Sequence, residues 1–233
     1  DRLRSRGLGD VYKRQILLSE IHEVSINYEK YCNDPKRDFS RKRKLPFELM
    51  LKNIIGMGSK SITNELIDIF QASGEMPSAS AFVQQRTKIR PEALKAVFDG
   101  FMSRILASAD KMRILAVDGS DIQIETNPKD KTSHISTSID KKSFNLLHLN
   151  ALYDLEEHVY TDAIIQAAKS QNEHGALNEM VDRSEIPKAL VIADRGYESY
   201  NDMAHIQEKG WFFLIRIKDG RNGIKMGLEL PRR

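Results

Sequence analysis

Cysteine is nearly absent from this sequence, which contains only Cys32 among its 233 residues. A single cysteine cannot form a disulfide within the chain, and it excludes zinc sites built from several cysteines. The six histidines do not stand at the paired spacing of zinc ligands. A chain without a disulfide framework is typical of a reducing compartment, so we expect a cytoplasmic protein.

Long hydrophobic runs and a strong excess of charge are also missing. No apolar stretch approaches the roughly 20 residues that a membrane helix needs, and we predict no membrane partner. The formal net charge is only +3, so local basic clusters, and not the overall charge, would have to indicate a nucleic-acid partner. The length suffices for one large domain or two small ones.

The two ends of the sequence lack the patterns of folded structure. The sequence begins at Asp1 without a methionine, and residues 4–15 (RSRGLGDVYKRQ) show no hydrophobic periodicity. We interpret residues 1–15 as a non-native leader and leave them out of the fold prediction. Residues 226–233 follow the last predicted strand with no capping structure, and we interpret them as a truncated end.

Apolar residues recur with helical spacing from Leu45 to Ile105. The pattern predicts four helices, which cover roughly residues 45–56, 62–70, 78–88 and 91–105. From Arg113 the period becomes that of strands. We predict strands over residues 113–118 (with a continuation to 124), 147–153, 159–166, 189–193 and 211–217, with helices over 173–183 and 200–209. This order predicts an α/β fold with a mixed sheet over residues 111–225, preceded by a helical region over 16–108.

Two aspartates, Asp118 and Asp194, directly follow apolar runs of this sheet. Should neighbouring strands bring them within about 4 Å, their carboxylates would repel by roughly 4 kcal/mol at an effective dielectric constant near 20. A divalent cation converts this repulsion into binding, and oxygen ligands favour Mg²⁺ or Mn²⁺. Two such ions can activate water and stabilise the leaving oxygen in phosphodiester cleavage.

Each aspartate alone also fits a structural role, because aspartate commonly follows a strand at a turn or helix cap. The two aspartates together favour a functional site over a structural role, since each is followed by a glycine within two residues. Asp121 should point to the opposite face of the strand from Asp118 and is not included. Glu173 and Glu179, on the predicted helix 173–183, are interpreted as surface charges.

The segments Val117-Asp118-Gly119-Ser120 and Ala193-Asp194-Arg195-Gly196-Tyr197 resemble the first and second acidic motifs of bacterial insertion-sequence DDE transposases. The resemblance covers roughly residues 40–225. It implies an RNase H-like catalytic core preceded by a helical DNA-binding region. It also implies that Asp118 and Asp194 are catalytic residues that bind Mg²⁺ or Mn²⁺ in a two-metal site. The family's third acid, a glutamate in a Tyr-Arg-Glu-Lys pattern, is absent, which implies an amino-terminal fragment that is inactive by itself.

The sequence therefore predicts a DNA transposase that cuts and joins double-stranded DNA at the terminal repeats of its insertion sequence. The resemblance implies a homodimer on DNA, associated with the bacterial nucleoid. Two alternatives remain open: a catalytically inactive DNA-binding fragment, and an unrelated RNase H-like metal-dependent nuclease.

Two groups of side chains in the helical region predict where DNA binds. Basic runs neutralise phosphates, and one such run contains Arg41, Lys42, Arg43 and Lys44. Gln, Arg and Lys side chains can read base edges when a helix lies in the major groove, and the third predicted helix carries Gln84, Gln85, Arg86 and Lys88. The alternatives are a solvated linker for the run and an exposed polar face for the helix.

Overall fold

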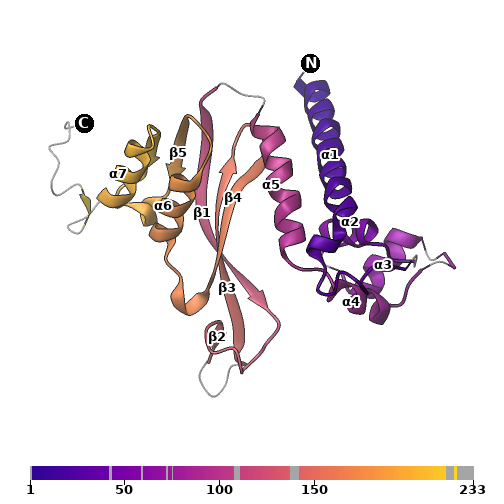
Figure 1. Ribbon diagram of the computed structural model, residues 1–233. Coiled ribbons are helices and arrows are strands. Elements are labelled where there is room, and N and C mark those ends of the chain that lie inside the picture. Colours follow the sequence, from indigo (N-terminus) through magenta and orange to yellow (C-terminus); the bar gives the residue numbers. More distant parts are fainter. Residues whose placement is uncertain are drawn as a thin grey trace. The chain divides into compact units, whose positions relative to one another are not determined.

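A computed structural model of the chain divides into two compact units, Asp1–Ala109 and Asp110–Arg233 (Figure 1). The structure describes residues 2–41, 44–58, 60–71, 73–74, 76–107, 111–136, 142–218 and 223–224. The described elements of the first unit are helices, and those of the second combine a sheet with helices. None of the helices in the described ranges has the length and apolar character needed to cross a bilayer.

The described residues of the first unit form five α-helices and one short 3-10 helix, η1. They are α1 (Arg2–Ile26), η1 (Tyr28–Tyr31), α2 (Phe47–Gly56), α3 (Ile62–Phe70), α4 (Ala79–Arg86) and α5 (Glu92–Leu106). The four helices that the apolar spacing predicts are α2 to α5, and these predictions are confirmed.

Helix α1 begins within the segment that the sequence analysis leaves out of the fold prediction and continues to Ile26. Its second half carries the buried side chains of Ile16, Ile21 and Val24. Ile21 and Val24 belong to one hydrophobic cluster with Phe47 of α2 and Val97 of α5. The first half of α1 has no apolar stripe, so periodicity cannot detect it. That residues 1–15 are non-native stays a prediction.

Cys32 lies in the same hydrophobic cluster and is buried. Burial is the main cause that raises the pKa of its thiol to about 11, and the nearby carboxylates of Asp38 and Glu29 add to the effect. The thiol is therefore protonated at neutral pH, and Cys32 packs as a small apolar residue.

A side-chain cap sets the start of α4. The hydroxyl oxygen of Ser78 accepts a hydrogen bond of 3.1 Å from the backbone N–H of Ala81. Replacing Ser78 with alanine should lower the free energy of unfolding by about 1 kcal/mol, because a helix N–H loses its partner. Urea denaturation followed by far-ultraviolet circular dichroism measures this change. Ser80→Ala, within the same helix, is the control and should change the free energy much less.

In the second unit, the described residues form a six-stranded sheet, two α-helices and two 3-10 helices. They are β1 (Arg113–Ile124), β2 (His134–Ile135), β3 (Phe144–Asp154), β4 (Val159–Ala167), η2 (Ala168–Ser170), α6 (Glu173–Arg183), β5 (Ala189–Ala193), η3 (Arg195–Tyr197), α7 (Tyr200–Glu208) and β6 (Phe212–Ile215). Every strand and helix predicted from Arg113 onward is present. The short strand β2 was not predicted, since it consists of two residues in a polar loop.

The strands form a mixed sheet in the order β2-β3-β1-β5-β6, and β4 also pairs with β3. Strand β1 is antiparallel to β3 and parallel to β5, while β5 and β6 are parallel. Three antiparallel strands followed by two parallel ones are the arrangement expected of an RNase H-like core. The predicted fold class, a mixed α/β sheet behind a helical region, is confirmed.

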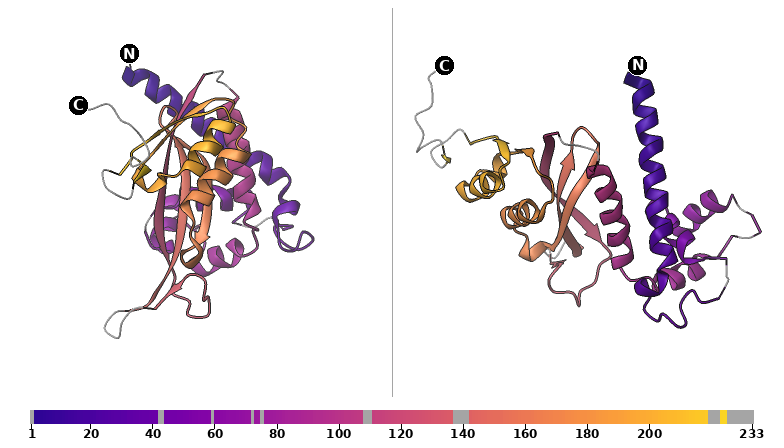
Figure 2. Two further views of the ribbon diagram at one scale, coloured as in Figure 1. Left: turned by 90° about the vertical axis from the view of Figure 1, so that its left-hand side faces the viewer. Right: turned by 45° about the horizontal axis from the view of Figure 1, so that its top comes forward.

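Helices α6 and α7 lie next to each other on one face of the sheet (Figures 1 and 2). Strands β1 and β5 bury alternate residues, among them Leu115, Val117 and Val191. Leu177 and Met180 of α6 are also fully buried. The end of the sheet that carries β2 projects beyond helices α6 and α7 (Figure 2). Strand β1 continues beyond its last pair with β5, Ala116 with Ile192, and the candidate site lies near this point.

Candidate active site

Asp118 lies within the central strand β1, after the last buried residue of that strand, Val117. Its side chain is exposed, and its Oδ1 atom accepts a hydrogen bond of 2.9 Å from the N–H of Gly119. Because side chains alternate along a strand, Asp118 points to the face opposite to that of Leu115 and Val117. A cavity of about 470 Å³ lies beside it, lined also by Ser120 and by residues of β3 and β4.

Asp194 directly follows the buried strand β5 and caps the turn η3. Its side chain is exposed, and its Oδ1 atom accepts a hydrogen bond of 2.7 Å from the N–H of Gly196. As in Asp118, one carboxylate oxygen is fixed by a local backbone N–H. Within the described part of the chain, Oδ2 of both residues has no hydrogen-bond or ion-pair partner.

The register of the two parallel strands relates Asp118 to Asp194. The paired residues run from Arg113 and Ala189 to Ala116 and Ile192. Continued by two residues, this register would set Asp118 opposite Asp194, which directly follows the last residue of β5. Neighbouring strands lie about 4.8 Å apart, and residues paired in this way present side chains to the same face.

Tyr197 is the last residue of η3, the turn that Asp194 caps. Its ring is buried, and its hydroxyl has no hydrogen-bond partner among the described residues. Burial raises the pKa of this phenol far above its ordinary value, and four carboxylates raise it further, those of Glu173, Asp118, Asp194 and Asp202.

Glu173 is not the simple surface charge that the sequence suggested. Its side chain is half-buried, and its Oε1 atom lies 3.0 Å from Nε2 of His148, which is buried in β3. The other ring nitrogen of His148, Nδ1, lies 2.8 Å from Oδ1 of Asp121. Asp121 thus faces away from Asp118, as predicted. Glu179, on the same helix, is exposed and pairs with Arg183 at 2.8 Å, in agreement with its interpretation as a surface charge.

A buried carboxylate connects α6 to α7 behind Tyr197. Asp202 of α7 is fully buried, and its carboxylate bonds to the ring of His174 and to the amide of Asn178. The ring of His174 in turn contacts Tyr197 edge-on, with centroids 6.1 Å apart. These contacts fix the first turn of α6, where Glu173 also lies.

The donor set at Asp118 and Asp194 fits a hard divalent cation. Both offer carboxylate oxygens, which Mg²⁺ and Mn²⁺ prefer, and Mg²⁺ commonly keeps several waters beside one or two protein carboxylates. In the described ranges of the chain, no group of three or more His, Cys, Asp or Glu side chains is arranged to hold a metal ion. Water would therefore complete the coordination of an ion held by these two residues.

The sequence of the second unit matches a known family. A profile described as "Transposase DDE domain" matches residues 109–227, just over half of the chain. The chain belongs to the transposase DDE domain family. Members of this family generally use divalent metal ions. The matched residues of this DDE domain include both Asp118 and Asp194.

Comparison with solved structures gives two similarities, and both are weak. No curated protein matches the sequence at a significant level. One similar solved structure is a piggyBac transposase synaptic complex with hairpin DNA, at 9% identity and a TM-score of 0.48, covering 75% of this chain and 41% of that one. Another is a Mos1 transposase paired-end complex with a left transposon end, at 13% identity and a TM-score of 0.27, covering 70% and 56%. The chain that contains this DDE domain thus spans about half the length of these two transposases.

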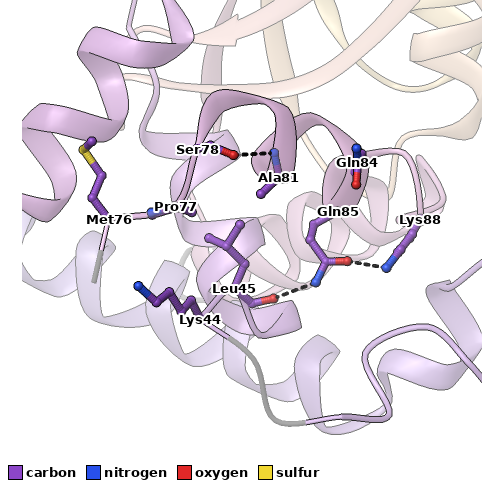
Figure 3. A pocket seen from close by; sticks show the side chains of 9 residues that line it. All are labelled: Lys44, Leu45, Met76, Pro77, Ser78, Ala81, Gln84, Gln85 and Lys88. Carbon is purple, nitrogen blue, oxygen red and sulfur yellow. Dashed lines mark hydrogen bonds between the residues drawn. The ribbon is translucent and has the colours of Figure 1, made fainter. Parts of the chain in front are cut away.

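The residues predicted to contact DNA lie around α4, in the first unit. Lys44, Gln84, Gln85 and Lys88 line a cavity of about 530 Å³ (Figure 3). None of the nine described residues that line this cavity is acidic. Arg41 lines a second cavity, which shares Gln85 and Lys88 with the first. Lys42 and Arg43 lie outside the described residues.

Gln85 differs from its predicted role as a base-reading residue. Its side chain is buried, its Nε2 atom donates to the backbone oxygen of Leu45, and its Oε1 atom accepts from Lys88 (Figure 3). With both ends of its amide engaged, Gln85 connects α4 to the segment before α2. Gln84 and Arg86 are exposed and remain the candidates for base contacts.

Proposed function

We propose that this chain acts as a DNA transposase, in which Asp118 and Asp194 bind the divalent cations that cleavage and joining of DNA strands require. The observation that supports this proposal is the register of β1 and β5, whose continuation by two residues would bring the two exposed aspartates opposite each other. Membership of the transposase DDE domain family supports it. Mg²⁺ or Mn²⁺, as a pair of ions, would supply an activated water and stabilise the leaving oxygen.

The chain's own residues prepare this site. The N–H groups of Gly119 and Gly196 donate to one oxygen of each carboxylate, and the other oxygen has no partner among the described residues. In strand cleavage, the water oxygen forms a bond to phosphorus, the bond from phosphorus to the leaving oxygen breaks, and that oxygen takes up a proton. In strand joining, a DNA hydroxyl takes the place of water.

A nicking assay tests this function. The full-length protein is incubated with Mg²⁺ and DNA that carries the terminal repeats of its insertion sequence. Nicks at the repeat ends that disappear when a chelator removes the metal are expected. Cleavage that is equally fast with the chelator present would contradict the proposal.

We also propose that double-stranded DNA binds the first unit, with Arg41, Lys42, Arg43 and Lys44 on phosphates, and Gln84, Arg86 and Lys88 near base edges. The support is the absence of acidic residues from the described lining of the cavity beside α4. The expected partner is the insertion-sequence terminal repeat, bound by a homodimer in the bacterial cytoplasm beside the nucleoid.

The salt dependence of DNA binding tests the role of Lys44. Each phosphate contact contributes about 0.9 to the slope of log affinity against log salt concentration. Lys44→Ala should reduce this slope by about one and weaken binding similarly for all DNA sequences. Fluorescence anisotropy between 50 and 200 mM salt, a range in which phosphate contacts change affinity strongly, measures it. Lys95→Ala is the control, because Lys95 pairs with Asp99 on α5. An equal slope change in both variants would contradict the assignment.

A further inference from the structure

We propose that the end of the sheet that carries β2 binds phosphates of the DNA on which the candidate active site acts, about six base pairs from the cleaved bond. The inference depends on the proposed function, since it assumes that DNA lies at Asp118. It assigns a partner to a surface of the second unit, whereas the DNA contacts proposed above belong to the first unit. We call this surface the β2 tip, and it consists of residues 125–136, Lys142 and Lys169.

Four exposed lysines gather on the β2 tip. They are Lys129, Lys131, Lys142 and Lys169. Among the described residues, no carboxylate lies within ion-pair distance of their ammonium groups, whereas Lys111 of the same unit pairs with Glu156 at 3.3 Å. Ammonium groups without a carboxylate partner can neutralise DNA phosphates, and such contacts supply affinity without reading the base sequence.

The acidic residues among the described residues of the tip are Glu125 and Asp130. The carboxylate of Asp130 accepts hydrogen bonds from the hydroxyl groups of Ser133 and Thr132, at 2.5 and 2.6 Å, and from the N–H of Thr132. These bonds, that of Ser133 foremost, lower the pKa of Asp130 to about 2. Local donors and not the lysines therefore stabilise this charge, and four lysines against two acids leave the tip positive.

A buried polar network fixes the shape of the tip. The side chain of Asn145 in β3 is fully buried, and its Nδ2 atom donates to the backbone oxygen of Asn127 and to the hydroxyl oxygen of Ser133. Its Oδ1 atom accepts from the N–H of Asn127 at 2.8 Å. The ammonium group of Lys169 donates to the backbone oxygen of Lys131 at 2.9 Å and connects η2 to the tip. Because these bonds exist before DNA binds, binding requires little further ordering of the backbone.

The tip lies further along the strand that carries Asp118. Strand β1 continues for six residues from Asp118 to Ile124, which is about 20 Å at a rise of roughly 3.3 Å per residue. This end of the sheet projects beyond α6 and α7 (Figures 1 and 2). Successive phosphates of one DNA strand are about 3.4 Å apart along the helix axis. A duplex that runs along β1 with its reacting phosphate at Asp118 therefore meets the tip about six base pairs away.

The salt dependence of DNA binding by the 233-residue chain tests the tip without relying on activity. Lys129→Gln combined with Lys131→Gln should lower the slope of log affinity against log salt concentration by about 1.8, because two phosphate contacts are lost. Lys188→Gln combined with Lys209→Gln is the matched control. It removes two charges from the same unit at positions that precede β5 and β6, and it should keep the wild-type slope.

Fluorescence anisotropy with a terminal-repeat duplex between about 50 and 200 mM salt measures these slopes, and circular dichroism confirms that each variant is folded. An unchanged slope in the tip variant, or an equal fall in both pairs of substitutions, would overturn the inference.

A DNA-cutting reagent locates the tip on the duplex. Lys129→Cys in the 233-residue chain carries an iron–EDTA group, and Cys32 does not compete for the reagent because its thiol is buried and protonated. We expect backbone cuts centred about six base pairs from the repeat end. Cuts confined to other positions, or no cuts, would contradict the assignment.

Asp118→Asn separates this inference from the proposed function. Should Asp118→Asn abolish nicking by the full-length protein while the tip variant binds DNA with the wild-type slope, the inference is overturned and the proposed function stands. Should Asp118→Asn nick DNA at the wild-type rate, the reacting phosphate does not lie at Asp118 and both fail.

Discussion

Replacing Asp118 with asparagine is expected to lower the rate of Mg²⁺-dependent DNA cleavage on the order of 1000-fold. The amide keeps the shape of the side chain but removes the charge that binds the cation. Stabilisation of transition-state charge by a bound metal is worth several kcal/mol, and each 1.36 kcal/mol corresponds to a tenfold change in rate. Asp194→Asn should have an effect of the same order, because the proposal assigns both aspartates to one metal site.

Single-turnover cleavage of a labelled terminal-repeat substrate by the full-length protein measures this effect. Asp182→Asn is the matched control, since Asp182 is an exposed aspartate of the same unit that contacts His205. It should cleave at the wild-type rate. Undiminished cleavage by Asp118→Asn or Asp194→Asn would rule out the proposed site.

The second large effect concerns stability and the buried ion pair between Arg113 and Asp154. Nη1 of Arg113 lies 2.7 Å from Oδ2 of Asp154, and their side chains are 2% and 0% exposed. Arg113→Met would leave the Asp154 charge buried without this partner, which costs about 3 to 5 kcal/mol. The pair joins the start of β1 to the end of β3, so its loss should loosen the centre of the sheet.

Trp211 provides the probe for this measurement. It is the only tryptophan of the chain and is buried in the second unit, so its fluorescence during urea denaturation reports on the sheet. Lys95→Met, which removes an exposed pair on α5, should change the free energy of unfolding by less than about 1 kcal/mol. If Arg113→Met lowered the free energy of unfolding by less than about 1 kcal/mol, the buried pair would not stabilise the sheet.

The sequence predicted the strands and most helices because their signals are local. The apolar run 114–117, the wholly apolar segment 189–193 and the apolar stripes of α2, α3 and α5 are all visible within short windows of the sequence. That Asp118 and Asp194 each follow an apolar run is visible locally in the same way. Whether Asp118 and Asp194 lie opposite each other depends on the pairing of β1 with β5. The order of the elements along the chain favours this pairing but does not determine it.

The features that the sequence did not predict depend on contacts between distant residues. Glu173 looks like any helical glutamate until α6 brings it to His148 and Gly119. Gln85 stands among exposed polar residues in the sequence, but the backbone of Leu45 and the side chain of Lys88 engage its amide. Helix α1 is held by its second half against α2 and α5. One local signal was present in the sequence. Gly119 directly follows the candidate ligand Asp118, and a glycine indicates a close approach of another group to the backbone.

A crystal structure of the protein with Mn²⁺ tests the central claim most directly, because anomalous scattering locates the ion. We expect a peak between the carboxylates of Asp118 and Asp194, with an oxygen of each at roughly 2.0 to 2.5 Å. A peak elsewhere, or two carboxylates too far apart to share an ion in the presence of saturating Mn²⁺, would contradict the account.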